Sequence, residues 1–138
     1  MARQRASADA APATTIFQVR DLDRAREHYR ALGFRVCRQS SENADCVVER
    51  GGLIVHLVRE GGGDRLTSTA YLTVDDAVAV ALEWSGPGIG GTTTVPMRTM
   101  QGRREGVHCD LDGNLIRFGS SIYKAIIQGT EEAQPSLS

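Results

Sequence analysis

The segment CDLDGNLIRFGS, residues 109–120, decides the fold because it holds a tight turn and the strand whose register that turn sets. Asp112-Gly113-Asn114 is a typical turn sequence, since glycine and asparagine adopt backbone conformations that other residues avoid. The flanking residues are extended and mostly apolar, which predicts a hairpin of two strands at 105–109 and 115–118. Arg117 interrupts the second of these strands with a permanent positive charge.

Upstream, residues 14–34 predict a strand followed by a helix. The run TTIFQV, residues 14–19, is β-branched and aromatic, as strands are. Asp21 is suited to cap a helix, and Gly33 is suited to end it. Between them, apolar residues recur at spacings of three and four, which indicates one buried helix face made of Leu22, Ala25, Tyr29 and Leu32.

Three further strands complete the first half of the chain. Extended runs are expected at 34–38, 44–49 and 53–58, and the glycine-rich segment at 60–64 is a joint between the two halves. The same order of elements then occurs a second time. The second half has a strand at 69–74, a helix capped by Asp75 and Asp76 that ends near Trp84, a strand near 92–95 and the closing hairpin.

The order β-α-β-β-β therefore appears twice, which predicts an α+β fold. We expect one domain at 14–123, built from two βαβββ modules at 14–60 and 67–120. The segments at 1–13 and 124–138 lack periodicity, and we expect them to be disordered tails.

Composition narrows the class of protein. The 138 residues carry a formal net charge of −1 with scattered Lys and Arg, which argues against nucleic-acid binding. No run of about 18 apolar residues is present, so no membrane span is expected. Three cysteines without a CxxC motif favour free thiols in a reducing compartment. We therefore expect a cytoplasmic protein.

Two stretches carry a resemblance to a known family. FQVRDLDRAREHYRALGF, residues 17–34, and REGVHCDLDGNLIRFGS, residues 104–120, resemble the opening and closing signatures of the vicinal oxygen chelate superfamily. Glyoxalase I, extradiol dioxygenases, fosfomycin-resistance enzymes and bleomycin-resistance proteins belong to it. Leu111 replaces the proline of the closing D-P-D-G-N motif. The resemblance implies two curved sheets that form a cleft, and a homodimer.

Most enzymes of this superfamily hold a divalent metal on four strands, and the resemblance places those ligand positions at Thr14, His56, Thr69 and Arg117. Only His56 is a good metal ligand. The guanidinium of Arg117 does not lose its proton in proteins and would repel a dication. The sequence therefore predicts no metal, no other cofactor and no catalytic residue.

The chain is most similar to the metal-free bleomycin-resistance branch, which sequesters a drug in a dimer cleft without modifying it. This resemblance implies an antibiotic-resistance protein whose partner is a small molecule such as a glycopeptide-type antibiotic. Strand alternation from the four ligand positions predicts an apolar cleft wall with polar groups. The predicted ligand-binding residues are Gln18, His56, Tyr71, Trp84 and Arg117.

Some of these residues could instead have a structural role in the core or in an ion pair. His56 and Tyr71 would suit the core, Trp84 could cap the core or line the cleft, and Arg117 could pair with a carboxylate such as Asp110 or Glu49. His28 is expected on the exposed side of its helix. Residues 97–104 are expected to form a long loop, either a lid or a mobile insertion.

Two other functions remain open. A metal-dependent lyase or dioxygenase with a rearranged site would use His56 and His108, and a non-catalytic scaffold would use the cleft for a protein partner. Bleomycin itself is cationic and its binders are acidic, whereas this chain is near neutral with an arginine at the predicted pocket. The resemblance therefore predicts a mode of binding better than a particular drug.

Overall fold

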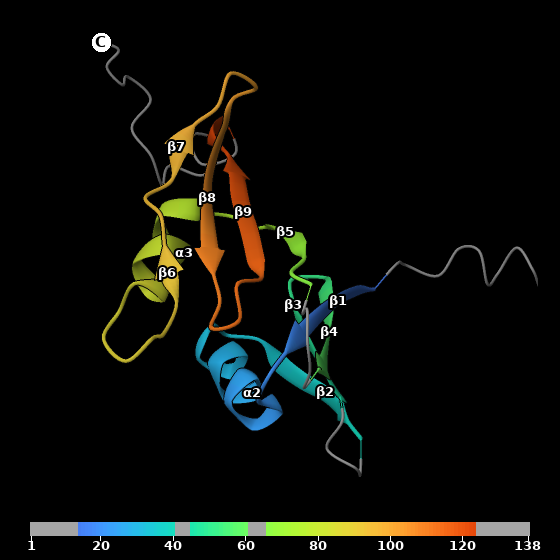
Figure 1. Ribbon diagram of the computed structural model, residues 1–138. Coiled ribbons are helices and arrows are strands. Elements are labelled where there is room, and N and C mark those ends of the chain that lie inside the picture. The colour runs from blue at the N-terminus through green and yellow to red at the C-terminus, as the bar shows by residue number, and fades with distance from the viewer. Residues whose placement is uncertain (1–13, 41–44, 61–65, 124–138) are drawn as a thin grey trace, which may run out of the picture.

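The computed structural model describes residues 14–40, 45–60 and 66–123, which form two β-sheets and two helices (Figure 1). The elements are β1 (Thr15–Val19), α2 (Leu22–Ala31), β2 (Arg35–Gln39), β3 (Asp45–Arg50), β4 (Leu53–Arg59), β5 (Thr69–Thr73), α3 (Ala77–Trp84), β6 (Thr92–Thr93), β7 (Met97–Arg98), β8 (Arg103–Cys109) and β9 (Leu115–Ser121). The predicted tails at 1–13 and 124–138, and most of the predicted joint at 60–64, lie outside the described residues.

Each module contributes one sheet. The first sheet has the strand order β1-β4-β3-β2, and the second has the order β5-β9-β8-β6. In both sheets the strand before the helix pairs in parallel with the last strand of its module, β1 with β4 and β5 with β9. The predicted α+β fold with two βαβββ modules is confirmed.

The second module contains one strand that the sequence did not predict. Residues 97–104 were expected to form a loop, but β7 pairs with β8, with Met97 opposite Glu105 and Arg98 opposite Arg104. Only the turn between the two strands is left outside the ladder. The segment is therefore a hairpin arm, in which the short β7 pairs with the first residues of the longer β8. Its own sequence has no alternation of apolar and polar residues that would have indicated a strand.

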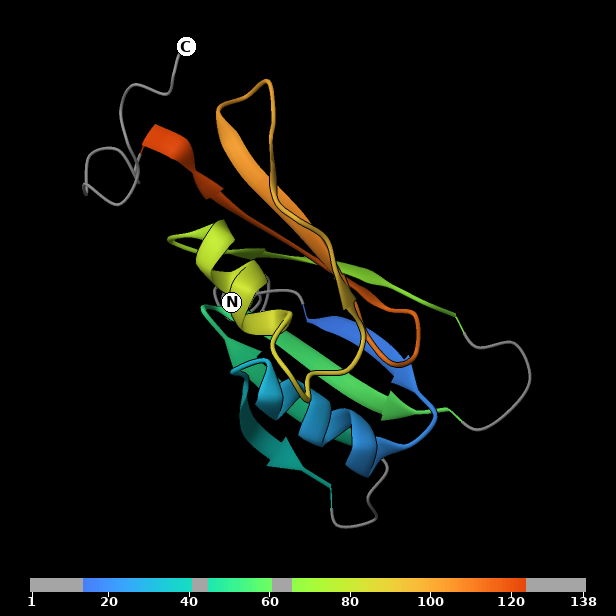
Figure 2. The same ribbon diagram turned by 90° about the vertical axis from the view of Figure 1, so that its left-hand side faces the viewer.

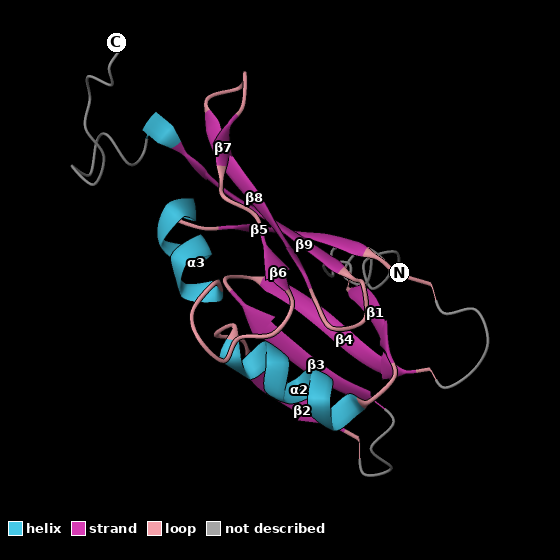
Figure 3. Ribbon diagram, turned by 60° about the vertical axis from the view of Figure 1, so that its left-hand side comes forward, coloured by secondary structure: helices cyan, strands magenta, loops and turns pink. Residues whose placement is uncertain are grey.

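Both helices begin with an aspartate cap. The side chain of Asp21 accepts a hydrogen bond from the backbone N–H of Arg24, and Gly33 follows the last turn of α2 with a positive φ of 88°. Asp76, rather than Asp75, caps α3 and accepts from the N–H groups of Val78 and Ala79. Figures 2 and 3 show both helices on the same side of the strand layer.

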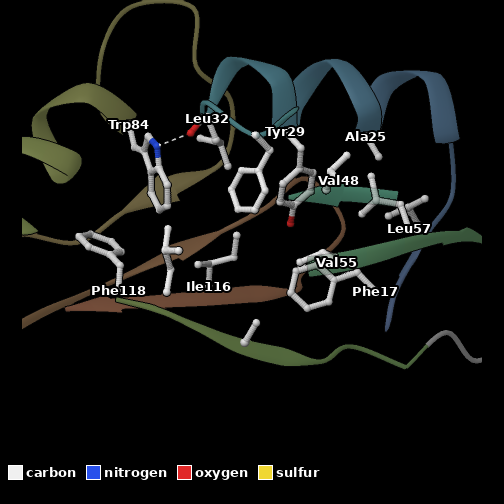
Figure 4. Packing of buried hydrophobic residues seen from close by; sticks show 14 of the residues in the cluster. Phe17, Ala25, Tyr29, Leu32, Val48, Val55, Leu57, Trp84, Ile116 and Phe118 are labelled. Carbon is white, nitrogen blue, oxygen red and sulfur yellow. Dashed lines mark hydrogen bonds between the residues drawn. The ribbon is translucent and has the colours of Figure 1, made fainter. Parts of the chain in front are cut away.

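A single core joins the two modules beneath the helices (Figure 4). Phe17 and Tyr29 from the first module and Trp84 and Phe118 from the second are all buried. The indole Nε1 of Trp84 donates to the backbone carbonyl of Leu32 at 3.0 Å, a bond that links the ends of the two helices. The modules therefore share one hydrophobic interior.

The closing turn after β8 is fixed by Asp110. Its Oδ1 atom accepts from the backbone N–H groups of Asp112 at 2.8 Å and Asn114 at 2.9 Å, and its Oδ2 atom accepts from the Tyr29 hydroxyl at 2.6 Å. The side chain of Asn114 donates to the carbonyl of Gln18 at 3.1 Å. These bonds fix the turn, and thus the register of β9, against the first module.

A buried histidine pair lies between α2 and β8. His28, expected to be exposed, is only 6% exposed, because β8 of the second module covers that flank of α2. Its Nε2 atom lies 3.0 Å from Nε2 of His108, whose Nδ1 atom is 2.7 Å from the Thr93 hydroxyl. Burial lowers the pKa of His28, and burial with the nearby charge of His28 lowers the pKa of His108 to about 4.

This pair predicts a dependence of stability on pH. The unfolded chain binds protons near a pKa of 6.5, whereas the folded pair stays neutral to lower pH, so the free energy of unfolding falls as the pH decreases from about 6.5 to about 4. The loss is on the order of 3 kcal/mol. Asp110, Arg24 and Asp112 also act on His28, the acids opposing its shift and the arginine adding to it.

Urea unfolding at a series of pH values measures this dependence. His108→Gln should flatten the decline, whereas His56→Gln, which removes an imidazole outside the pair, should leave it in place. A free energy of unfolding in the unmodified chain that stays constant between about pH 6.5 and about pH 4 would contradict the prediction.

Neither described helix is long and apolar enough to cross a membrane.

Candidate ligand-binding site

The strands have one face in the core and one face away from the helices. Phe17, Leu57, Leu72 and Phe118 point into the core, and the residues between the buried ones point the other way. We call this second side the open face, and it consists of Ile16, Gln18, Ile54, His56, Val58, Tyr71, Thr73, Leu115 and Arg117 together with their cross-strand neighbours on β3 and β8.

The strand registers place four predicted ligand residues on the open face. His56 lies opposite Ile16 on the neighbouring strand, two residues before the position that pairs with Gln18. Tyr71 lies directly opposite Arg117 in the second sheet. Gln18 and His56 thus belong to one sheet, and Tyr71 and Arg117 belong to the other.

The fifth predicted residue, Trp84, does not lie on the open face. Its side chain is 1% exposed and packs edge-on against His108 and Phe118, with ring centroids 5.4 and 5.1 Å away. The indole N–H is satisfied by the Leu32 carbonyl. Trp84 is a core residue, which corrects its assignment to the ligand site.

Tyr71 and Arg117 belong to a polar cluster centred on Glu105 of β8. The Tyr71 hydroxyl donates to Oε2 of Glu105 at 2.6 Å, the short distance expected for a hydroxyl bound to a carboxylate. Arg103 donates from Nε to the Tyr71 hydroxyl at 3.1 Å and lies 3.5 Å from Glu105. Arg117 approaches Oε1 of Glu105 at 3.6 Å, which is an ion pair without a hydrogen bond.

The pKa of Tyr71 reflects this setting. Burial is the largest cause of its raised pKa, and the hydrogen bond to Glu105 raises the pKa further, whereas Arg103 lowers it. The phenol therefore stays protonated and remains a donor at neutral pH. Glu105, not Asp110 or Glu49 as considered from the sequence, is the carboxylate beside Arg117.

Gly119 makes the close approach of these side chains possible. It lies directly opposite Thr73 on β5 and Glu105 on β8. A Cβ atom at position 119 would overlap the Tyr71 hydroxyl oxygen and lie 2.9 Å from Cγ of Glu105. Any side chain here would push Tyr71 and Glu105 apart.

His56 on the first sheet is bound to a carboxylate. Its Nε2 atom lies 2.6 Å from Oδ2 of Asp45, and both side chains are about one quarter exposed, at 25% and 23%. This hydrogen bond is the largest cause of a lowered pKa at Asp45. His56 is therefore a half-buried, oriented imidazole on the open face rather than a core histidine.

The side chain of Gln18 makes one hydrogen bond within the fold. Its side-chain Oε1 atom accepts from the backbone N–H of Leu66 at 2.9 Å, next to the start of the second module. Among the described residues its amide NH₂ group has no hydrogen-bond partner, so two donors remain for other groups there.

A hollow of about 390 Å³ beside Arg117 is lined by residues of β7, β8 and β9 and of the segment before β7. Its lining includes Val95, Met97, Arg98, Glu105, Val107 and Arg117. Val95 and Met97 are 80% and 71% exposed, so apolar surface faces solvent here. A larger hollow of about 510 Å³ lies at the β3–β4 turn, beside the Arg50–Glu83 ion pair, and contains none of the predicted site residues.

The superfamily's metal does not fit the residues at its four positions. Thr14, Thr69 and Arg117 supply no imidazole or carboxylate, which leaves His56 as the one good ligand among the four positions. Within residues 14–40, 45–60 and 66–123, no three His, Cys, Asp or Glu side chains gather in a group suited to a metal ion.

The sequence did not reveal three of the residues in these contacts, namely Asp45, Arg103 and Glu105. A usable signal existed for Glu105, because counting back from the closing turn places Cys109 opposite Leu115 and therefore Glu105 opposite Gly119. Asp45 is the diagonal neighbour of His56 across β3 and β4, where Val47 is directly opposite. Applying strand registers to charged residues would have found both carboxylates.

Comparison with known proteins agrees with this architecture. A bleomycin resistance determinant encoded on the transposon Tn5 superposes with a TM-score of 0.68 at 23% identity, over 81% of this chain and 98% of that chain. A bleomycin-binding protein complexed with bleomycin gives 0.64 at 21% identity, over 81% and 99%. Lactoylglutathione lyase from Agrobacterium tumefaciens gives 0.64 at 16% identity, over 80% and 93%.

The chain therefore shares the fold of these three proteins, and the fold that the sequence resemblance implied is confirmed. The similar structures include both binding proteins and a lyase, so the fold alone does not choose between binding and catalysis. No protein-family profile matches the sequence, and no curated protein matches it significantly.

Proposed function

We propose that the protein sequesters an antibiotic-type small molecule, without a metal and without chemical change, in a cleft completed by a second copy of the chain. The supporting observation is that Gln18, His56, Tyr71 and Arg117 share the open face with exposed apolar residues. Ligand pockets combine mostly apolar walls with a few polar groups that orient the ligand. The similarity to bleomycin-binding proteins supports the same kind of function.

The exposure of this face supports the proposed homodimer. Ile16 and Tyr71 are 52% and 38% exposed in the single chain, and Met97 of β7, which lies opposite Glu105, is 71% exposed. A second copy facing these strands would cover them and enclose the ligand. Such a protein would act in the cytoplasm, where it would intercept a drug before the drug reaches its target.

Isothermal titration calorimetry against bleomycin and a panel of other cytotoxic antibiotics tests the proposal, with light scattering to measure the mass in solution. We expect a dimer that binds at least one compound, and mass spectrometry should recover that compound unchanged. A monomer that binds nothing in the panel would refute the proposal, and a chemically altered ligand would replace sequestration with catalysis.

A second candidate is a metal-dependent lyase or dioxygenase with a rearranged site. The observation in its favour is the His56–Asp45 pair, which places two possible ligands 2.6 Å apart on the open face. Elemental analysis of the purified protein separates the two candidates, because stoichiometric manganese, iron, nickel or zinc would favour the enzyme.

A further inference from the structure

Tyr71 and Arg117 both contact Glu105, but the two contacts differ in length and strength. Tyr71 holds the carboxylate with a 2.6 Å hydrogen bond, whereas Arg117 lies 3.6 Å away and its side chain is 49% exposed. Exposed ion pairs of this kind contribute little, because water screens them and two long side chains must be ordered. Glu105 is therefore bound mainly by Tyr71, and Arg117 is only loosely paired.

Arg117 accordingly keeps unused hydrogen-bonding capacity. A guanidinium has five N–H donors in a planar arrangement that matches two oxygens of a carboxylate, sulfonate or phosphate. Among the contacts of the described residues, Arg117 has the ion pair with Glu105 and no side-chain hydrogen bond of normal length. Arg117 is one of the residues that line the hollow of about 390 Å³.

The charges around the hollow favour a negative group. Arg117 lines it together with one carboxylate, that of Glu105, and Arg103 lies 3.5 Å from the same carboxylate. The cluster therefore has more positive than negative side chains. The remaining lining is largely apolar and includes Val95, Met97 and Val107.

We propose that the ligand is an anionic, partly apolar small molecule whose acidic group binds Arg117 in place of Glu105. This inference rests on the proposed binding function and assigns a chemical class to its ligand. Tyr71 and Arg103 keep the Glu105 carboxylate on their side, and Gly119 leaves the space in which this arrangement forms. Glu105 is then an internal counter-ion that the ligand's charge replaces at Arg117.

A matched pair of fluorescent probes tests the charge requirement. 1-Anilinonaphthalene-8-sulfonate and N-phenyl-1-naphthylamine share the same aromatic skeleton, and only the first carries a sulfonate. We expect the protein to bind the sulfonate more tightly, and this preference should shrink as NaCl rises from about 50 mM to about 500 mM.

Three variants locate the effect. Arg117→Gln should reduce sulfonate affinity about tenfold, because a charge-assisted hydrogen bond is lost, and should leave affinity for the neutral probe unchanged. Glu105→Gln should raise sulfonate affinity several-fold, since it removes the competing carboxylate. Arg35→Gln is the matched control, an exposed arginine paired with Glu49 on β3, and should change neither probe.

Each outcome has a defined meaning. Equal binding of the two probes, or a sulfonate preference that survives Arg117→Gln, would overturn the anionic ligand while leaving the binding function intact. Failure of both probes and of the antibiotic panel would overturn the binding function as well. Gly119→Ala provides a second variant, because it separates Tyr71 from Glu105 and should change the sulfonate preference without altering the charge of the chain.

Discussion

Replacement of Trp84 by alanine is expected to lower the free energy of unfolding by about 4 kcal/mol, at the upper end of the range for core substitutions. The ring is 1% exposed, and its N–H group bonds to the Leu32 carbonyl at 3.0 Å. Since Trp84 belongs to α3 and Leu32 follows α2, the cavity would open where the two modules meet. Urea unfolding monitored by circular dichroism measures the loss.

Two further variants separate packing from other causes. Trp84→Phe keeps an aromatic ring beside Phe118 but loses the hydrogen bond, so we expect a loss of about 1–2 kcal/mol. Leu82 lies on the same helix and is 71% exposed, so Leu82→Ala should change stability little. If Trp84→Ala altered ligand affinity while stability stayed the same, the core assignment of Trp84 would be wrong.

The sequence and its family resemblance together predicted which residues share a face on β1, β4, β5 and β9, and the part owed to alternation has a local reason. Side chains alternate along a strand, so a few positions with a known direction determine the rest. The turn at 112–114 sets the register of β9 against β8, and that register places Arg117 opposite Val107. The resemblance implied His56 and Arg117 as positions on one face, and alternation from its other two positions, Thr14 and Thr69, added Gln18 and Tyr71.

The errors lie where distant parts of the chain meet. Trp84 and His28 are buried because each module covers the flank of the other module's helix, and a helical pattern in one module carries no information about that contact. The partner of Arg117 was missed for a similar reason. Tyr71 reaches Glu105 only because β5 and β8 lie on either side of β9, a sheet order that depends on a parallel pairing between residues far apart in sequence.

Asp110→Ala is expected to cost about 4 kcal/mol, because it leaves several buried donors without an acceptor at about 1–3 kcal/mol each. Asp110 is 6% exposed and receives hydrogen bonds from the Tyr29 hydroxyl and from the backbone N–H groups of Asp112 and Asn114. Burial, followed by the charge of Asp110, raises the pKa of Tyr29 well above its usual value, so the phenol remains a donor. Urea unfolding measures the total loss.

The same substitution should also act on the ligand site, because Asp110 fixes the turn from which β9 begins. Hydrogen exchange should show faster exchange at the amides of β9, including that of Arg117, than at those of β3 on the other sheet. Tyr29→Phe is the control, since it removes one hydrogen bond at about 1 kcal/mol and leaves Asp110 bound to the turn. If Asp110→Ala accelerated exchange equally in both sheets, global destabilisation would explain the result. A selective effect on β9 would mean that the position of Arg117 depends on a carboxylate seven residues earlier in the chain.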